Sequence, residues 1–284
     1  MARATLEVPR HFSLASTVRS HGYYQTSPFS WEDGGLGRID HVGSSVYPVR
    51  IYEQDGLTVE VIGCRRVPAA YVARVRRMLQ LDRSLTELYR ALNQHKRLAW
   101  VKTHGYGRIL RSGDLFEDIG KAICGTNVQW TQAVKMANRI CTLGDSCKAG
   151  PTFPTPEQVT EAGEGWLREH ARTGYRAQAI VKFAQAIVDG EFELELLDTT
   201  ATQLSGDEVR KELKRVPGVG PATARYLAGF LGHFDKPSVD SLVIDFAQRS
   251  KLVKNVTPAA IESYYDRRFG SWAGLVCWLD VWAF

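Results

Sequence analysis

The segment V-P-G-V-G at residues 216–220 constrains the fold more than any other part of the chain. On either side of it, from residue 207 to residue 231, apolar residues recur at helical spacing and predict two short helices. Gly218 and Gly220 can adopt positive φ and let another backbone approach closely, and Pro221 suits the first position of a helix. The pattern predicts a helix-hairpin-helix motif.

Such a hairpin leaves unpaired backbone N–H groups at the start of its second helix, where an anion can bind. A nucleic-acid phosphate suits this position, although the glycines alone fit an ordinary packing corner between two helices equally well. Asp240, in K-P-S-V-D-S, follows the second glycine by twenty positions. We expect its carboxylate to return to the same edge of the motif.

Composition is that of a soluble globular protein, with 284 residues, 44% hydrophobic and 24% charged. Neither a membrane span of about eighteen apolar residues nor a signal peptide is evident, so we expect a cytoplasmic monomer without membrane contact. The net charge of +5 suits a polyanion partner. The basic cluster nearest the hairpin comprises Arg210, Lys211, Lys214 and Arg215.

The five cysteines form no C-x-x-C pair. This spacing suits neither a zinc site nor an iron–sulfur cluster, so we expect free thiols and no required cofactor.

The fold class expected is α+β, with a small N-terminal antiparallel β-sheet module packed on a mostly α-helical body that contains the hairpin. Alternating β-branched and aromatic residues between about residues 5 and 62 predict the sheet, and helical periodicity follows from residue 69. We therefore place an α/β module at residues 1–68 and the helical body at residues 69–284, with the hairpin at about 207–231.

Several motifs, in this order along the chain, resemble those of the helix-hairpin-helix DNA glycosylases, in their 8-oxoguanine and bacterial 3-methyladenine (alkylbase) branches. They are F-S-W (29–31), R-R-M-L-Q-L-D-R-S-L-T-E-L-Y (76–89), G-R-I-L-R-S-G-D-L-F-E-D-I-G-K-A-I-C-G-T-N (107–127), F-P-T-P-E-Q-V (153–159), G-Y-R-A (174–177), the hairpin and V-D-S (239–241). Together they cover most of the chain and are far more specific than any one alone.

The resemblance implies hydrolysis of the N-glycosidic bond of a damaged or modified base flipped out of double-stranded DNA. Asp240 matches the family's catalytic aspartate, which stabilises positive charge on the sugar or deprotonates the attacking water. The same residue could instead cap a helix over residues 242–248, a role compatible with catalysis. Asp245, one helical turn further on, is the nearest rival and fits a surface carboxylate better.

Bifunctional members of the family have a nucleophilic lysine at the position of Ala222, so the resemblance implies a glycosylase without lyase activity. Phosphate contacts are expected from the hairpin and its flanks, at Gly218, Gly220, Ala222, Thr223 and Lys214. The backbone carbonyls of Lys214, Val216 and Val219 match the family's site for a monovalent cation, Na⁺ or K⁺.

Other matching positions concern the opening of the duplex. Tyr175 matches an aromatic wedge, Arg176 after it is expected to contact DNA, and Asn127 matches the residue that fills the gap left by the flipped nucleotide. Tyr175 could instead pack at a helix start, and Asn127 could be a helix cap. Gln132 stands where an arginine that reads the opposite cytosine is expected, so selectivity for that base is in doubt.

The expected base pocket comprises Tyr226, Ala222, Trp278, Trp282 and Tyr23. We expect only one of the two tryptophans to line the site. Tyr23 is included because it lies near the segment that borders the pocket in the 8-oxoguanine branch. An aromatic residue at the position of Tyr226 is typical of the alkylbase branch and suits a positively charged alkylpurine. The alkylbase enzymes have a tryptophan where this chain has Ala222, which reshapes the pocket.

An alkylated purine is therefore the leading substrate, followed by an oxidised purine and by another modified base, including a modified cytosine. The alternative from another class is a non-catalytic DNA-binding protein that uses the hairpin alone. Asp240 favours the enzyme, because a carboxylate beside the DNA backbone weakens simple binding.

Overall fold

A computed structural model describes residues 1–283, with side chains to residue 282. The contacts divide the chain into two compact units. Unit 1 comprises residues 1–84 and 103–194, and unit 2 comprises residues 85–102 and the chain from residue 195 onward.

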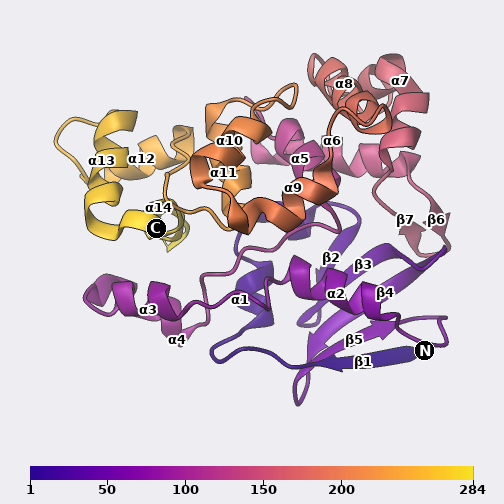
Figure 1. The fold of residues 1–284 in the computed structure, drawn as a ribbon, viewed down its shortest axis with the longest axis horizontal. Coiled ribbons are helices and arrows are strands. Elements are labelled where there is room, and N and C mark those ends of the chain that lie inside the picture. The colour runs from indigo at the N-terminus through magenta and orange to yellow at the C-terminus, as the bar shows by residue number, and fades with distance from the viewer. Residues whose placement is uncertain (284) are drawn as a thin grey trace. The chain divides into compact units, whose positions relative to one another are not determined.

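Unit 1 contains a five-stranded antiparallel sheet with the strand order β1-β5-β4-β3-β2 (Figure 1). Its strands are β1 (Ala2–Leu6), β2 (Phe29–Glu32), β3 (Gly35–Val42), β4 (Ser45–Glu53) and β5 (Leu57–Val61). The sheet predicted from the alternating pattern is thus confirmed.

Two tight turns of this sheet use residues that adopt positive φ. Asp33 (φ 48°) and Gly34 (φ 70°) join β2 to β3, and Asp55 (φ 52°) and Gly56 (φ 126°) lie between β4 and β5. Aspartate tolerates the left-handed region better than most residues, and glycine has no Cβ to clash there. The aspartate and glycine residues of these turns are what indicated antiparallel strands in the sequence.

Helices from beyond residue 68 complete the core of the sheet. Tyr71, Val75 and Met78 of α2 (Ala69–Met78) are buried in one apolar cluster with Val49 of β4 and Val59 of β5. The division of the chain by contacts therefore differs from the predicted boundary between residues 68 and 69.

The remaining helices of unit 1 follow the sheet or lie within its connections. They are α1 (Leu14–Val18), η1 (Gly22–Gln25), α5 (Leu115–Cys124), α6 (Trp130–Ile140), η3 (Cys141–Leu143), α7 (Pro156–Glu169) and α8 (Arg176–Val188), with a ribbon of β6 (Ser146–Cys147) and β7 (Gly150–Pro151). The helix α7 is kinked at Gly163, which has φ 72°.

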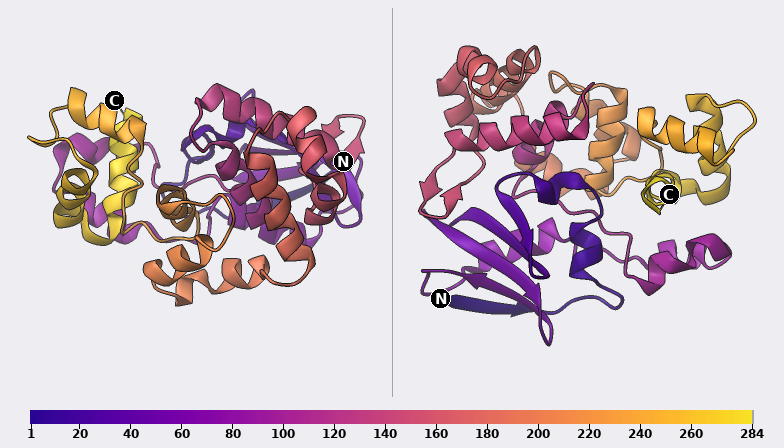
Figure 2. Two further views of the ribbon diagram at one scale, coloured as in Figure 1. Left: turned by 90° about the horizontal axis from the view of Figure 1, so that it is seen from above. Right: turned by 180° about the vertical axis from the view of Figure 1, so that it is seen from behind.

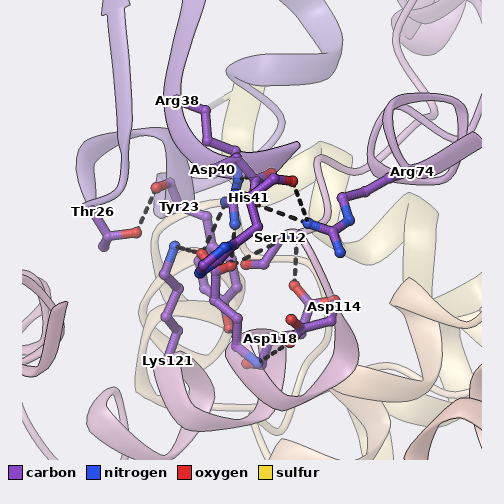
Figure 3. A network of polar contacts seen from close by, with 12 residues as sticks. Tyr23, Thr26, Arg38, Asp40, His41, Arg74, Ser112, Asp114, Asp118 and Lys121 are labelled. Atoms are coloured by element: carbon purple, nitrogen blue, oxygen red, sulfur yellow. Dashed lines mark hydrogen bonds and ion pairs between the residues drawn. The ribbon is translucent and has the colours of Figure 1, made fainter. Parts of the chain in front are cut away.

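A buried ionic network joins the sheet to α5 (Figure 3). Arg38 of β3 pairs with Asp40 at 2.8 Å and with Glu117 of α5 at 2.6 Å, and Lys121 pairs with Glu117 at 2.7 Å. All four side chains are buried. Burial alone would raise the pKa of Glu117, but Arg38 and Lys121 lower it to about 2. Removing one partner would leave a buried charge uncompensated, which is strongly destabilising.

Unit 2 is helical and discontinuous in sequence. It comprises α3 (Thr86–Leu92), η2 (Lys96–Leu98), α4 (Ala99–Thr103), α9 (Leu194–Thr200), η4 (Ala201–Gln203), α10 (Gly206–Leu213), α11 (Pro221–Phe230), α12 (Ser241–Arg249), α13 (Pro258–Phe269), η5 (Gly270–Trp272) and α14 (Ala273–Ala283). Its two sequence segments lie together in both views of Figure 2, where the purple helices border the yellow ones.

The carboxylate of Asp280 on α14 holds these two segments together. It pairs with Arg97 of the earlier segment and accepts a hydrogen bond of 2.9 Å from the hydroxyl of Tyr265 on α13. Asp280 is buried, so both partners compensate for its lost hydration. Among residues 1–283, no helix is long and apolar enough to cross a membrane. The α+β fold class predicted from the sequence is confirmed.

Candidate functional site

The predicted hairpin is present in unit 2. Helix α10 ends at Leu213 and α11 begins with Pro221 at its first position, so the predicted helices are confirmed within one or two residues. A capping box of Ser205 and Glu208 fixes the start of α10. No side chain caps the start of α11, where Gly220 is the N-cap residue. Gly220 therefore provides no side-chain acceptor for the first N–H groups of α11, which suits an anion site.

The two hairpin glycines have different physical roles. Gly218 has φ 82°, a conformation that other residues adopt only with strain. Gly220 has φ −83°, which any residue adopts, so its predicted freedom to take positive φ is not used. A Cβ added at Gly220 would meet no atom within 4 Å. Gly218 makes the turn, whereas Gly220 leaves open space at the start of α11.

Two arginines of the basic cluster beside the hairpin pair with carboxylates. Arg210 is buried and pairs with Asp235 and Asp207, both at 2.8 Å, and Arg215 pairs with Glu212 at 2.5 Å. Lys211 and Lys214 are exposed. The sequence overestimated the positive charge here, because it does not show which arginines have carboxylate partners.

Asp240 is the N-cap residue of α12. One carboxylate oxygen, Oδ1, accepts a hydrogen bond of 3.0 Å from the backbone N–H of Val243, and the side chain is exposed. The capping role considered for this residue is therefore real, and the cap fixes the orientation of the carboxylate. The second oxygen, Oδ2, is not used by the cap.

The segment before Asp240 is fastened to the hairpin helix by two hydrogen bonds. The Ser238 hydroxyl donates to the backbone carbonyl of Ala222 at 2.9 Å, and Arg225 donates to the carbonyl of Pro237 at 3.2 Å. Arg225 is in turn held by an ion pair with Glu262 of α13. The structure thus places Asp240 two residues from a direct contact with the start of α11, at the edge where the sequence predicts it.

The rival carboxylate, Asp245, is engaged elsewhere. It pairs with Arg249 one turn further along α12, at 2.9 Å, and both side chains are about half exposed. This is the surface position that the sequence favoured for Asp245, with a weak i,i+4 ion pair.

The aromatic residues of the expected base pocket form a row in unit 2. The Tyr226 ring is 4.8 Å from Phe230 and 6.2 Å from Trp278, measured between ring centroids, and Trp278 is stacked 6.2 Å from Trp282. Tyr226 and Trp278 are half-buried, whereas Trp282 is 41% exposed. Ala222, one turn before Tyr226 on α11, is exposed and contributes only a methyl group.

In unit 1, the two residues expected to open the duplex lie together. The amide of Asn127 donates to the hydroxyl of Tyr175 at 3.3 Å, and this hydrogen bond lowers the pKa of Tyr175. Asn127 has φ 50°, and Tyr175 is 61% exposed. The structure therefore presents an exposed tyrosine that is hydrogen-bonded to an exposed loop residue, while the wedge and gap-filling roles stay predictions.

Arg176 does not have the exposed position that a contact with DNA needs. Its side chain is buried, its Nε donates to the carbonyl of Thr126 at 3.1 Å, and its guanidinium lies 4.5 Å from the centre of the Tyr175 ring. Arg176 thus supports the Asn127 loop and the Tyr175 ring from inside. A direct contact of Arg176 with DNA stays a prediction, which this buried position does not favour.

Tyr23 is also buried, with 1% of its surface exposed, so it offers no face to a substrate. The ring that covers it is Trp130, which is 38% exposed and stacked parallel to Tyr23. Sequence reasoning missed Trp130 because it is more than a hundred positions away. The available signal was its place three residues after Asn127, in G-T-N-V-Q-W.

No protein-family profile matches the chain. The N-glycosylase/DNA lyase of Saccharomyces cerevisiae is 30% identical over 158 residues, which span 51% of this chain and 42% of that protein. The chain therefore matches less than half the length of this relative.

Two solved structures are similar over nearly the whole chain. One is the 8-oxoguanine glycosylase/lyase of Clostridium acetobutylicum, with a TM-score of 0.78, 21% identity, and coverage of 99% of this chain and 96% of that one. The other is the 3-methyladenine DNA glycosylase of Archaeoglobus fulgidus, with a TM-score of 0.76, 23% identity, and coverage of 99% and 98%. The chain has the fold of the 8-oxoguanine and 3-methyladenine DNA glycosylases, as its motifs predict.

Proposed function

We propose that this protein is a DNA glycosylase that hydrolyses the N-glycosidic bond of a damaged or modified base in duplex DNA. The fastening of the Asp240 segment to Ala222 carries the proposal, because it brings a fixed carboxylate to the open start of α11. The yeast relative, which is named as an N-glycosylase/DNA lyase, supports the same reaction class.

Asp240 supplies the charge that the reaction needs. When the base departs, positive charge develops on the deoxyribose, and a carboxylate stabilises this charge or accepts a proton from the attacking water. Oδ1 is held by the Val243 N–H, which leaves Oδ2 for the sugar or the water. Because the cap fixes the carboxylate before substrate binds, little reorganisation is needed during the reaction.

The hairpin would hold a phosphate next to this carboxylate. The uncapped start of α11 offers the N–H groups of Ala222 and Thr223, and the space beside Gly220 admits the DNA backbone. The carbonyls of Lys214, Val216 and Val219 are hard oxygen donors, and Lys214 is the C-cap of α10, where helix carbonyls lack intrahelical partners. This donor set fits a Na⁺ or K⁺ ion that would partly neutralise the phosphate.

We expect no lyase activity, because Ala222 has no amine to attack the sugar. The product would be an abasic site in an unbroken strand. The yeast relative is named as a lyase as well, so strand cleavage has to be measured separately.

The row of Tyr226, Trp278 and Trp282 favours an alkylated purine as the substrate. Electron-rich rings attract a positively charged planar base, and tryptophan does so most strongly. An oxidised purine is the second candidate, since the fold is equally similar to an enzyme of that kind.

The test compares Asp240→Asn with Asp245→Asn on duplexes that carry alkylated, oxidised, deaminated or otherwise modified bases, with and without alkali. Asparagine caps a helix as well as aspartate does, so Asp240→Asn should keep the start of α12 and lose only the charge. We expect base release to fall at least about a hundredfold for Asp240→Asn and to persist for Asp245→Asn.

Each result separates two readings of the protein. Cleavage only after alkali treatment would support a glycosylase without lyase activity, and cleavage without alkali would reveal a nucleophile elsewhere. Equal release by the wild type and Asp240→Asn would remove Asp240 from the mechanism. No release by the wild type from any duplex would favour a non-catalytic DNA-binding protein.

A further inference from the structure

Trp130 presents a flat aromatic face whose orientation is fixed on three sides. Its indole N–H donates to Gln25 Oε1 at 2.6 Å, and its ring lies parallel to that of Tyr23, with 6.4 Å between centroids and 5° between planes. Beside the ring lies Gly22, where an added Cβ would overlap Cε2 and Cζ2 of the indole. The ring therefore has little freedom to move, although 38% of the residue is exposed.

The support beneath Trp130 is itself rigid. The Tyr23 hydroxyl donates to the carbonyl of Asp118 at 3.0 Å, and Lys121 lies 5.5 Å from the centre of the Tyr23 ring. Lys121 belongs to the buried ionic network with Glu117 and Arg38 (Figure 3). A buried network thus anchors the tyrosine on which the tryptophan rests.

The surroundings of Trp130 match a surface that meets opened DNA. Asn127 is three residues away, which limits the separation of the two backbones to about 11 Å. Asn127 contacts the exposed Tyr175, so the segment from Asn127 to Trp130 contains one exposed aromatic residue and contacts another. Gln25, whose side chain contacts the indole, and Asn127 have exposed amides that could interact with a base edge.

We propose that the exposed face of Trp130 binds a nucleobase that has left the helical stack. This inference rests on the proposed function and concerns a residue of unit 1 alone. Every base has a π-face, so stacking needs no particular sequence, and a ring that is already fixed loses little entropy on binding.

The test measures affinity in an Asp240→Asn background, which keeps the base attached. Two duplexes differ only at one position, where the first carries 1,N6-ethenoadenine and the second a tetrahydrofuran analogue of an abasic site. Trp130→Ala should weaken binding of the ethenoadenine duplex roughly five- to a hundredfold, and binding of the abasic duplex much less. Quenching of ethenoadenine fluorescence by Asp240→Asn, lost in the Trp130→Ala double variant, would report the stacking directly.

Trp166→Ala is the matched control, because Trp166 is a partly exposed tryptophan of the same unit that stacks on His170 at 5.2 Å. It should change neither affinity. If Trp130→Ala fails to fold, Trp130→Phe should retain most of the affinity, and Gly22→Ala, which displaces the indole, should reproduce the loss.

The outcomes distinguish this inference from the proposed function. Equal losses for both duplexes would assign Trp130 to the unpaired base of the opposite strand, which supports the proposal with that base as ligand. No loss for either duplex would overturn the proposal and leave the Asp240 chemistry untouched. If Asp240→Asn binds neither duplex better than undamaged DNA, both the inference and the proposed function fail.

Discussion

His21 should make the stability of the protein depend on pH above the range in which carboxylates titrate. Its side chain is 1% exposed, and Nε2 lies 2.6 Å from the carbonyl oxygen of Leu110, to which the neutral ring can donate a hydrogen bond. Burial lowers the pKa of His21, the hydrogen bond to the Leu110 carbonyl raises it in part, and the nearby Lys121 lowers it again, so that the resulting pKa is about 4. The folded protein therefore keeps this ring neutral at pH values where the unfolded chain protonates it.

The size of the effect follows from the two pKa values. The unfolded value is 6.5 and the folded value about 4, a difference of about 2.5 units or roughly 3 kcal/mol at 1.36 kcal/mol per unit. Because the unfolded state binds the extra proton, the free energy of unfolding falls as pH falls through the window from 6.5 to 4. The contribution is fully present above pH 6.5, and about 2.5 kcal/mol of it should be lost by pH 4.5.

The assay is urea unfolding at several pH values between 7.5 and 4.5, for the wild type and His21→Gln. Glutamine keeps an N–H donor for Leu110 but does not titrate, so the variant should lose less stability on acidification. Glu117, whose pKa is lowered to about 2, loses its stabilising effect mainly below pH 4.5 and is common to both proteins. His170→Gln, at an exposed position, is the control. A difference between wild type and His21→Gln that stays constant with pH would refute the reasoning.

Substitutions at Gly218, Gly220 and Arg225 test the hairpin and the placement of Asp240. Gly218→Ala should cost about 1 to 2 kcal/mol of unfolding free energy because of φ 82°. Gly220→Ala should cost at most about 1 kcal/mol, because glycine is a better N-cap than alanine, and should weaken duplex binding roughly tenfold; the same affinity as wild type would refute the phosphate site. Arg225→Ala frees the carbonyl of Pro237 and leaves Glu262 unpaired, so single-turnover base release should fall roughly ten- to a hundredfold with little change in duplex affinity. Arg225→Lys should restore part of the rate, and equal losses of rate and affinity in Arg225→Ala would indicate general damage to the fold instead.

The sequence predicted those helices and turns whose conformation depends mainly on residues close together in the chain. The hairpin helices follow from apolar spacing with Pro221 at a helix start, and the strand turns from aspartate and glycine pairs that tolerate positive φ. The position of Asp240 at a helix start was also accessible, since aspartate is among the strongest N-cap residues.

Contacts between distant segments were not accessible in this way. The pair of Arg97 and Asp280 joins residues 183 positions apart, and nothing local to either residue indicates that residues 85–102 pack with the C-terminal helices. The same limit explains Arg210, whose partner Asp235 is 25 positions away and removes its charge from the basic cluster.

The contrast between Asp240 and Tyr23 shows which site residues a sequence can locate. Asp240 accepts a hydrogen bond from the first turn of α12, and the segment just before it is held by the contact of Ser238 with Ala222. Its position in the chain therefore nearly determines where its carboxylate lies. Tyr23 could point to solvent or to the core, and that choice depends on Lys121, Asp118 and Trp130, which lie about a hundred positions away. A motif that determines a backbone conformation therefore predicts reliably where its side chain lies. A motif that contains only an aromatic residue predicts the region of the ring, but not its exposure. In that region the exposed ring is Trp130, and it is the residue to test for contact with the base.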